Sequence, residues 1–324
     1  MSESEGTQRS LDITVVIPTY NGADRIPAVL DKLRSQGVPD NWQWEVLVVD
    51  NNSQDNTRDV VKQHQENWPA DVPLRYVFEA RQGLAFARQC GIENAGGDLI
   101  GFLDDDNLPE ATWVAAACSF AQDHPQAGAY GSEIEGQFES PPPADLKPIL
   151  FYLALNKRGD QPLQYDPRVT GVPPGAGLVV RRHAWLTHVP ANLLLVGRVG
   201  QSMLAGEDAE ALLYLHRAGW EIWYAPTMKI QHCISASRLT PTYLQDNLYG
   251  IGLCRHHLRM LALPVWQRPI MFWMYLLSDL RRVILHYFKH RSSLGTNVVA
   301  TCEMKRLLGT FISPFYLFTL RWKS

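Results

Sequence analysis

The chain has 324 residues, 46% hydrophobic and 19% charged, an ordinary globular composition with ample material for one large domain or two modest ones. Its five cysteines are odd in number and scattered, which argues against a disulfide framework or a zinc site and favours a reducing cytoplasm. Residues 1–10 are polar throughout, so we expect a disordered N-terminus and no signal peptide.

The net charge of −3 is unevenly distributed along the chain. Residues 255–324 hold eleven Lys or Arg side chains against two acids, a net charge of +9, whereas the rest of the chain carries −12. Such asymmetry indicates an anionic partner for the C-terminal segment, either nucleic acid or a membrane surface.

Strand and helix patterns alternate through the first hundred residues. The strand-like runs are β-branched or continuously apolar, and the segments between them carry apolar residues at helical spacing. Predicted strands cover 13–17, 45–49, 74–78 and 99–103, and predicted helices cover 26–33, about 55–68 and 84–95. This repetition predicts βαβ units, and therefore an α/β fold with a mainly parallel sheet flanked by helices.

Three acids, Asp104, Asp105 and Asp106, follow the fourth predicted strand without a gap. In an extended loop alternate side chains point the same way, so Asp104 and Asp106 can converge on one cation while Asp105 faces elsewhere. Oxygen ligands suit Mg²⁺ or Mn²⁺, which would also make the joint ionisation of three adjacent carboxylates easier. An acidic surface turn containing Asn107 and Pro109 is the simpler alternative.

Polar clusters also follow the first two strands, at 19–21 and 50–57, where ligands gather in a parallel sheet. Asp50 suits the imide N–H of a pyrimidine base or a ribose hydroxyl. Neither G-x-G-x-x-G after the first strand nor G-x-x-x-x-G-K-[ST] is present, so phosphate charge must be met by metal. Arg81 and Arg88 could add positive charge, with solvation of an exposed helical arginine as the alternative.

The second half of the chain adds another acidic pair. Glu207 and Asp208 open an apolar helix pattern and could reach the far side of the same cleft, with helix capping alone as the alternative. Two short strands are predicted at 221–225 and 228–232. His232, at the end of an edge-like strand, could be a third metal ligand, a phosphate contact or a purely structural histidine.

The C-terminal segment predicts a long amphipathic helix whose basic residues lie mostly off its apolar face. The residues of that face are Trp273, Leu276, Leu277, Leu280, Val283, Ile284 and Tyr287. Its uncharged runs are too short to span a bilayer. The pattern suits the surface of an anionic membrane, with docking against the rest of the chain as the alternative, and we expect no nucleic-acid partner.

Together these segments resemble family 2 glycosyltransferases of the GT-A fold. The matching pieces occur in order and at family-like spacing between residue 13 and about residue 235. They are 15–21, 48–53 with Asp55 and Thr57, 87–88, 91–92, 95–96, 102–106 and 206–208. The resemblance implies a GT-A domain over 11–240, with a nucleotide-binding half at 11–131 and an acceptor half at 132–240. A basic amphipathic helical tail over 241–324 would follow.

The resemblance also implies roles for the residues of the donor site. Pro18, Tyr20 and Asp50 would hold the base of a nucleotide sugar, with UDP as the first expectation and GDP or dTDP as alternatives. Arg88 and Asp105 would complete the donor site, with Asp105 on the ribose side. Asp104 and Asp106, with His232, would hold Mg²⁺ or Mn²⁺.

Asp208 would be the catalytic base of an inverting transfer, with Glu207 beside it at the acceptor. The acceptor would be a glycan or a lipid-linked sugar in cell-surface or extracellular polysaccharide assembly. The enzyme itself would lie in the cytoplasm or peripherally on the inner face of the plasma membrane. The Q-x-x-R-W motif of processive relatives is absent, which favours transfer of a single sugar. The alternatives are a nucleotidyltransferase that makes nucleotide sugars and a non-enzymatic membrane-associated binding module.

Overall fold

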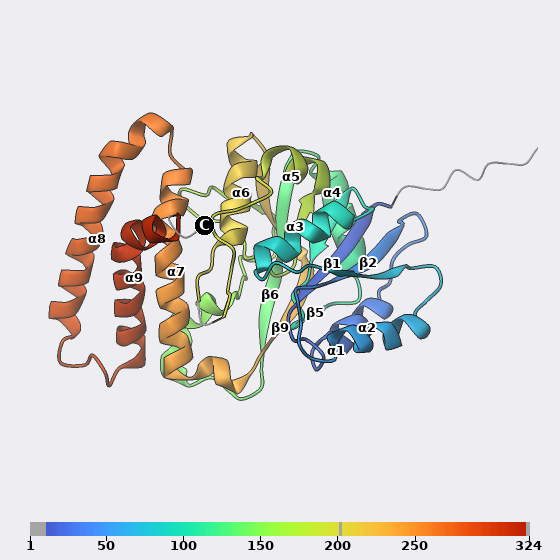
Figure 1. Ribbon diagram of the computed structural model, residues 1–324, viewed down its shortest axis with the longest axis horizontal. Coiled ribbons are helices and arrows are strands. Elements are labelled where there is room, and N and C mark those ends of the chain that lie inside the picture. Colours follow the sequence, from blue (N-terminus) through green and yellow to red (C-terminus); the bar gives the residue numbers. More distant parts are fainter. Residues whose placement is uncertain (1–10, 201–202, 322–324) are drawn as a thin grey trace, which may run out of the picture.

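The computed structural model describes residues 11–200 and 203–321 (Figure 1), so the disorder predicted for residues 1–10 falls outside the described residues. The strands are β1 (Ile13–Thr19), β2 (Trp44–Asp50), β3 (Leu74–Phe78), β4 (Leu99–Phe102), β5 (Asn107–Pro109), β6 (Ala127–Phe138), β7 (Leu163–Gln164), β8 (Leu178–Arg181) and β9 (Glu221–Ile234). The α-helices are α1 (Ile26–Arg34), α2 (Thr57–Glu66), α3 (Leu84–Asn94), α4 (Trp113–Asp123), α5 (Arg182–His188), α6 (Glu207–Arg217), α7 (Pro241–Leu261), α8 (Arg268–His290) and α9 (Val298–Arg321). Three 3₁₀ segments complete the described elements: η1 (Ala144–Leu153), η2 (Ala236–Leu239) and η3 (Val265–Gln267).

The strands form one sheet in the order β3-β2-β1-β4-β8-β6-β9-β5, with β7 paired to β9. β3, β2, β1 and β4 run parallel, as the alternating pattern predicts. β8 runs antiparallel to both β4 and β6, and β6 pairs in parallel with β9. The predicted α/β fold is confirmed, with the parallel N-terminal half joined through β8 to a mixed half.

Helices cover both faces of the sheet because its central strands bury side chains on both faces. In β1, Ile13, Val15 and Ile17 pack into the core formed with α1, α2 and α4. Val16 packs instead into a second core with α3, α5 and α6. Because alternate side chains enter the two cores, residues 13–17 are apolar on both faces of the strand apart from Thr14.

One long strand, β9, replaces the two short strands predicted at 221–225 and 228–232. Its pairing with β6 shifts register at two points, and the larger shift follows the pair of Ser132 with Ala225, because the next pair is Glu133 with Lys229. Pro226 lies in the skipped segment, and because proline has no backbone N–H to offer a ladder, the pairing resumes only beyond it. The strand is also internal, since β5 pairs with its C-terminal end, so the edge position expected near His232 was wrong.

Three long helices follow the sheet domain, with α7 and α9 packed together and α8 on the outer side (Figure 1). The close approach of α7 and α9 depends on glycine, since a Cβ on Gly309 would lie 2.5 Å from the Tyr249 carbonyl oxygen. Leu244 and Leu248 of α7 and Cys302 of α9 share a buried cluster with η1 and the end of β9. Among the described residues, none of the helices combines the length and apolarity needed to cross a bilayer.

Candidate active site

A cleft of about 770 Å³ opens at the carboxyl ends of β1 and β4. Its other walls come from η1, the turn at 173–176, the start of α6 and the first turns of α7. Nine of the ten predicted site residues line it: Pro18, Tyr20, Arg88, Asp104, Asp105, Asp106, Glu207, Asp208 and His232. The sheet therefore brings the acidic triplet and the distant Glu207–Asp208 pair to one cavity.

Asp50 is the predicted site residue that does not line this cleft. It is buried at the end of β2, where its carboxylate accepts hydrogen bonds from the Ser53 N–H at 2.8 Å and the Tyr76 hydroxyl at 2.7 Å. These partners hold the loop that follows β2. The proximity of Asp50 to β1 stays compatible with a role at the base, which remains a prediction.

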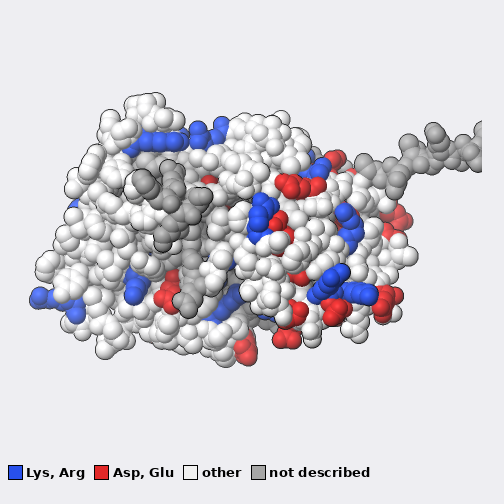
Figure 2. All heavy atoms as spheres, in the orientation of Figure 1, with Lys and Arg blue, Asp and Glu red and all other residues white. Residues whose placement is uncertain are grey.

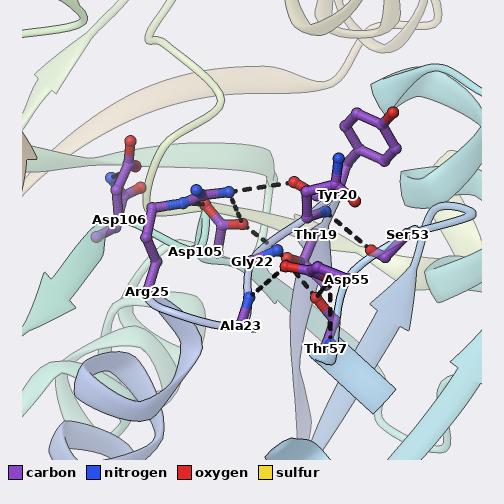
Figure 3. A network of polar contacts seen from close by, with 12 residues as sticks. Thr19, Tyr20, Gly22, Ala23, Arg25, Ser53, Asp55, Thr57, Asp105 and Asp106 are labelled. Carbon is purple, nitrogen blue, oxygen red and sulfur yellow. Dashed lines mark hydrogen bonds and ion pairs between the residues drawn. The ribbon is translucent and has the colours of Figure 1, made fainter. Parts of the chain in front are cut away.

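The loop after β1 is attached to the loop after β2 by hydrogen bonds (Figure 3). The Asn21 N–H donates to Ser53 Oγ at 2.9 Å, and the Gly22 N–H donates to Thr57 Oγ1 at 2.9 Å. The Ala23 N–H donates to Asp55 Oδ2 at 3.1 Å. Tyr20 precedes this anchored segment and remains exposed, so its ring is available to a ligand.

Asp105 points back to the loop after β1 (Figure 3). Arg25 Nε and Nη2 donate to its two carboxylate oxygens at 2.9 and 2.8 Å, and the Thr19 hydroxyl donates at 2.6 Å. A two-pronged guanidinium contact of this kind fixes the orientation of a carboxylate. Asp105 thus faces away from Asp106, as alternation along an extended loop requires.

Asp106 lies between two basic side chains. Arg238 Nη2 donates to its Oδ2 at 2.7 Å, and His232 Nε2 lies 3.5 Å from the same oxygen. Burial alone would raise the pKa of Asp106, but the charge of Arg238 and its hydrogen bond lower the pKa below its usual value. His232 Nδ1 donates to the Leu153 carbonyl at 3.0 Å, which leaves Nε2 as an acceptor for Arg238 at 2.8 Å.

Asp104 is the other candidate metal ligand, and Arg88 Nη2 donates to its Oδ1 at 3.3 Å. Burial raises the pKa of Asp104, and Arg88 opposes the shift while Asp106 and Asp105 add to it. The described residues contain no group of three His, Cys, Asp or Glu side chains that could hold an ion alone. The two carboxylates nevertheless fit Mg²⁺ or Mn²⁺, which use one or two carboxylates with substrate phosphate oxygens.

Arg88 lies beneath the cleft and joins both acidic groups. Its side chain is 2% exposed, so the solvated arginine considered from the sequence was wrong. One guanidinium nitrogen contacts Asp208, the same nitrogen lies 3.6 Å from Glu207, and the other contacts Asp104. A single buried cation thus balances carboxylates from both sides of the cavity.

Asp208 is fixed from its other side by the turn at 173–177. Its Oδ2 accepts the Gly175 N–H at 3.0 Å, and a Cβ at residue 175 would collide with the carboxylate. The absence of a side chain at residue 175 therefore allows the close approach of Asp208. Glu207 is buried beside it, and its Oε2 has no hydrogen-bond partner among the described residues.

Several cleft residues were missed from the sequence. Arg198 donates to the Tyr243 hydroxyl at 2.9 Å and to Asn247 Oδ1 at 2.7 Å, which ties the loop before α6 to α7. Arg25 and Arg238 were also missed. No local sequence motif identifies these arginines, because each contacts a residue that is far away in the chain. The helical tail predicted from residue 241 therefore begins with a wall of the cleft.

Residues 14–182, more than half of the chain, match the family described as "Glycosyl transferase family 2". The chain is 24% identical over 258 residues to the succinoglycan biosynthesis protein ExoM of Rhizobium meliloti, which covers 78% of this chain and 76% of ExoM. It is 36% identical over 107 residues to the glycosyltransferase AglE of Haloferax volcanii, 33% of this chain and 34% of AglE. The matched region thus spans about a third of AglE.

The fold resembles solved glycosyltransferase structures. The mannosyltransferase PcManGT from Pyrobaculum calidifontis, in complex with GDP-Man and Mn²⁺, aligns with a TM-score of 0.60 and 18% identity over 95% of this chain and 88% of that chain. GalNAc-T7 with UDP, GalNAc and Mn²⁺ aligns with a TM-score of 0.51 and 17% identity over 79% of this chain and 52% of that chain. These likenesses show the GT-A fold. With the match over residues 14–182, they establish that the chain belongs to glycosyl transferase family 2 and is a glycosyltransferase.

Proposed function

We propose that this glycosyltransferase moves a single sugar, with inversion, from a nucleotide sugar to an acceptor hydroxyl. The observation that carries the proposal is the meeting of Asp104 and Asp106 with Asp208 around one cavity, joined by Arg88. A donor whose diphosphate lies at Asp104 and Asp106 would have its anomeric carbon between these two carboxylates and Asp208. An acceptor near Asp208 can then attack the face opposite the leaving phosphate.

The donor side would use the residues at the strand ends. Pro18 and Tyr20, with Asp50 below them, would hold the base, and Asp105 would face the ribose. Asp104 and Asp106 would bind the divalent metal with the diphosphate, with His232 as a further ligand or a phosphate contact. When bound, Mg²⁺ or Mn²⁺ stabilises the negative charge that develops on the diphosphate.

The acceptor side would use Asp208 as general base. Its carboxylate takes the proton of the acceptor hydroxyl as the new C–O bond forms and the sugar–phosphate bond breaks, and the nucleoside diphosphate leaves with the electron pair. Arg88 and the Gly175 N–H hold the carboxylate in place. Glu207, with a buried oxygen lacking a partner among the described residues, would accept a hydrogen bond from the acceptor sugar.

UDP is the first donor nucleotide to test, with GDP and dTDP as alternatives, because the structurally similar proteins include complexes with GDP-Man and with UDP. The likeness to ExoM along most of its length favours polysaccharide assembly on a glycan or lipid-linked acceptor. Membership of family 2 favours this reaction over a nucleotidyltransferase or a non-enzymatic module. The deciding experiment is hydrolysis and transfer across a panel of nucleotide sugars with and without Mn²⁺. Absence of turnover for every donor would overturn the proposal.

A further inference from the structure

α8 exposes a row of large apolar side chains. All of its residues are described, and Asp279 is the one that is buried. Trp273, Leu277 and Phe288 are 64%, 65% and 64% exposed. The α8 outer face, as we name it, consists of Ile270, Trp273, Met274, Leu277, Ile284, Leu285 and Phe288. At 100° per residue these positions fall within an arc of about 120°, and Arg281 lies within the same arc, so the strip is apolar apart from one cation.

The inner side of α8 already attaches the helix to the rest of the protein. Asp279 accepts a hydrogen bond from Arg259 of α7 at 2.6 Å, and α8 packs on α9 (Figure 1). Leu276 and Val283, predicted to share one face with Trp273, are only partly exposed, whereas Trp273 and Leu277 point outward. The apolar side chains of α8 therefore extend beyond those that pack against the rest of the protein. The exposed ones, which form the α8 outer face, indicate an interaction surface.

The charges around this strip have one sign. Arg281, Arg282 and Lys289 of α8 are exposed, and Arg291 follows them, whereas the single acid of the helix is buried against Arg259. Figure 2 shows the α8 end of the molecule as largely uncharged surface with basic side chains at its margins, while most acids lie over the sheet domain. Apolar side chains with cations among and beside them complement an anionic lipid surface.

An apolar groove continues the strip between α7, α8 and α9. It has a volume of about 520 Å³, and Trp273 and the exposed Phe318 belong to its lining. Met260 and Leu317 extend the lining inward, and Arg268 lies beside it. A groove of this kind accommodates a flexible hydrocarbon chain with a negatively charged head near the arginine.

We propose that the α8 outer face rests on an anionic lipid bilayer, with the groove receiving an acyl chain of that bilayer. Trp273 and Tyr287 suit the headgroup boundary, where aromatic side chains gather. α7, which packs on α9, also lines the cleft with Tyr243 and Asn247. The inference rests on α8 and its charges and does not require the proposed reaction.

The test is flotation of the full chain with phosphatidylcholine vesicles that contain or lack phosphatidylglycerol. We expect flotation with the anionic vesicles and at least about tenfold weaker binding to neutral ones. The triple variant Trp273→Ser, Leu277→Ser, Phe288→Ser should lose about tenfold or more of the binding to anionic vesicles. The matched control, Phe78→Ser with Val169→Ser, removes exposed apolar side chains elsewhere and should bind like the parent.

A second variant separates charge from apolar contact. Arg281→Gln with Arg282→Gln and Lys289→Gln should lose roughly fivefold in binding per charge removed, and added salt should weaken the parent in the same way. Circular dichroism and stabilisation by UDP with Mn²⁺ would establish that each variant is folded.

Three results would overturn the proposal. They are failure of the parent to float with anionic vesicles, equal flotation of the parent with anionic and neutral vesicles, and flotation of the triple apolar variant equal to that of the parent. Light scattering tests whether a second copy of the chain, rather than a bilayer, covers the α8 outer face. A parent dimer that the apolar variant converts to a monomer, with flotation unchanged, would assign the face to self-association instead.

Discussion

Arg88 and Asp208 are in direct contact beneath the cleft, although one comes from α3 and the other from the start of α6. The contact places a fixed positive charge behind the residue that we propose as the base, and the same guanidinium reaches Asp104 on the proposed donor side. The two halves of the site are thus coupled through one buried side chain. Each prediction below isolates one part of this arrangement.

Asp208→Asn should lower the transfer rate by about 10² to 10⁴ with donor affinity nearly unchanged, because the amide keeps the shape of the carboxylate but cannot take a proton. Single-turnover transfer and calorimetric donor binding measure the two effects. Asp123→Asn, an exposed acid on α4, is the control. Turnover at the parental rate would remove Asp208 from its role.

Gly175→Ala should reduce transfer by at least about tenfold, since the added Cβ would displace the carboxylate of Asp208. The thermal unfolding midpoint should change little, because the turn lies at the cleft. Gly37→Ala is the matched control, as its nearest neighbour would be the Ala111 carbonyl oxygen at an ordinary 3.7 Å. Equal activity of both variants would contradict the positioning of Asp208 by Gly175.

Asp106→Ala should abolish most of the extra stabilisation that Mn²⁺ adds to UDP, with donor binding at least about tenfold weaker in its presence. The expected cause is the loss of one of the two carboxylates proposed as metal ligands. Thermal shifts with UDP, with Mn²⁺ and with both give a readout that does not depend on activity. If parent and variant respond alike to the combination, Asp106 is not a ligand.

Asp55→Asn should lower the unfolding midpoint at pH 7, with a loss of about 1 kcal/mol, the usual net value of a hydrogen bond. Asp55 accepts from the Ala23 N–H with one oxygen and from Thr57 with the other, and an amide offers only one acceptor. Desolvation alone would raise the pKa of Asp55, but the hydrogen bonds from Thr57 and Ala23 lower it. Its stabilisation is therefore complete above the ordinary aspartate pKa and is lost as the pH falls through the lowered value.

The difference between Asp55→Asn and the parent should consequently shrink as the pH is lowered below about 4. Denaturant unfolding at several pH values measures this trend. Asp24→Asn, on the exposed side of the same loop, is the control. A difference that stays constant down to about pH 3 would show that the ionised carboxylate is not the stabilising form.

Gly309→Leu should destabilise the protein by about 1 to 3 kcal/mol, because the side chain would push α9 away from Tyr249 on α7. For a chain of this size each kcal/mol corresponds to about 2 to 4 °C in the unfolding midpoint. The neighbouring, partly exposed Leu308→Ala should have a much smaller effect. Equal midpoints for Gly309→Leu and the parent would mean that α7 and α9 separate easily.

Much of the sheet and the composition of the site could be predicted locally. Runs of β-branched, mostly apolar residues such as 13–17 indicate strands buried on both faces. The polar residues that follow these runs lie at the carboxyl ends of the strands, where a ligand site is expected. The resemblance to family 2 glycosyltransferases is confirmed by the match over residues 14–182. What the sequence could not provide was the partner of each charge.

Arg25, Arg238 and Arg88 illustrate the reason. Arg25 binds Asp105 and Arg238 binds Asp106, contacts that depend on how loops from different strands meet in space. Arg88 is one of many helical arginines by its pattern alone, and only the convergence of three acids upon it explains its burial. The exposure of the α8 outer face could likewise not be predicted, because periodicity identifies the apolar side of a helix but not which of its residues pack against other helices.

The wall contributed by α7 has a practical meaning for how the protein can be dissected. The family match ends at residue 182, yet Tyr243, Asn247 and Ile251 lie in the cavity, and α7 is held in turn by α9. A fragment shortened before α7 would lose part of the candidate active site along with the C-terminal helices, so its inactivity would say nothing about binding to lipid. Separating the proposed transfer reaction from the proposed membrane attachment therefore calls for point substitutions on the α8 outer face in the intact chain.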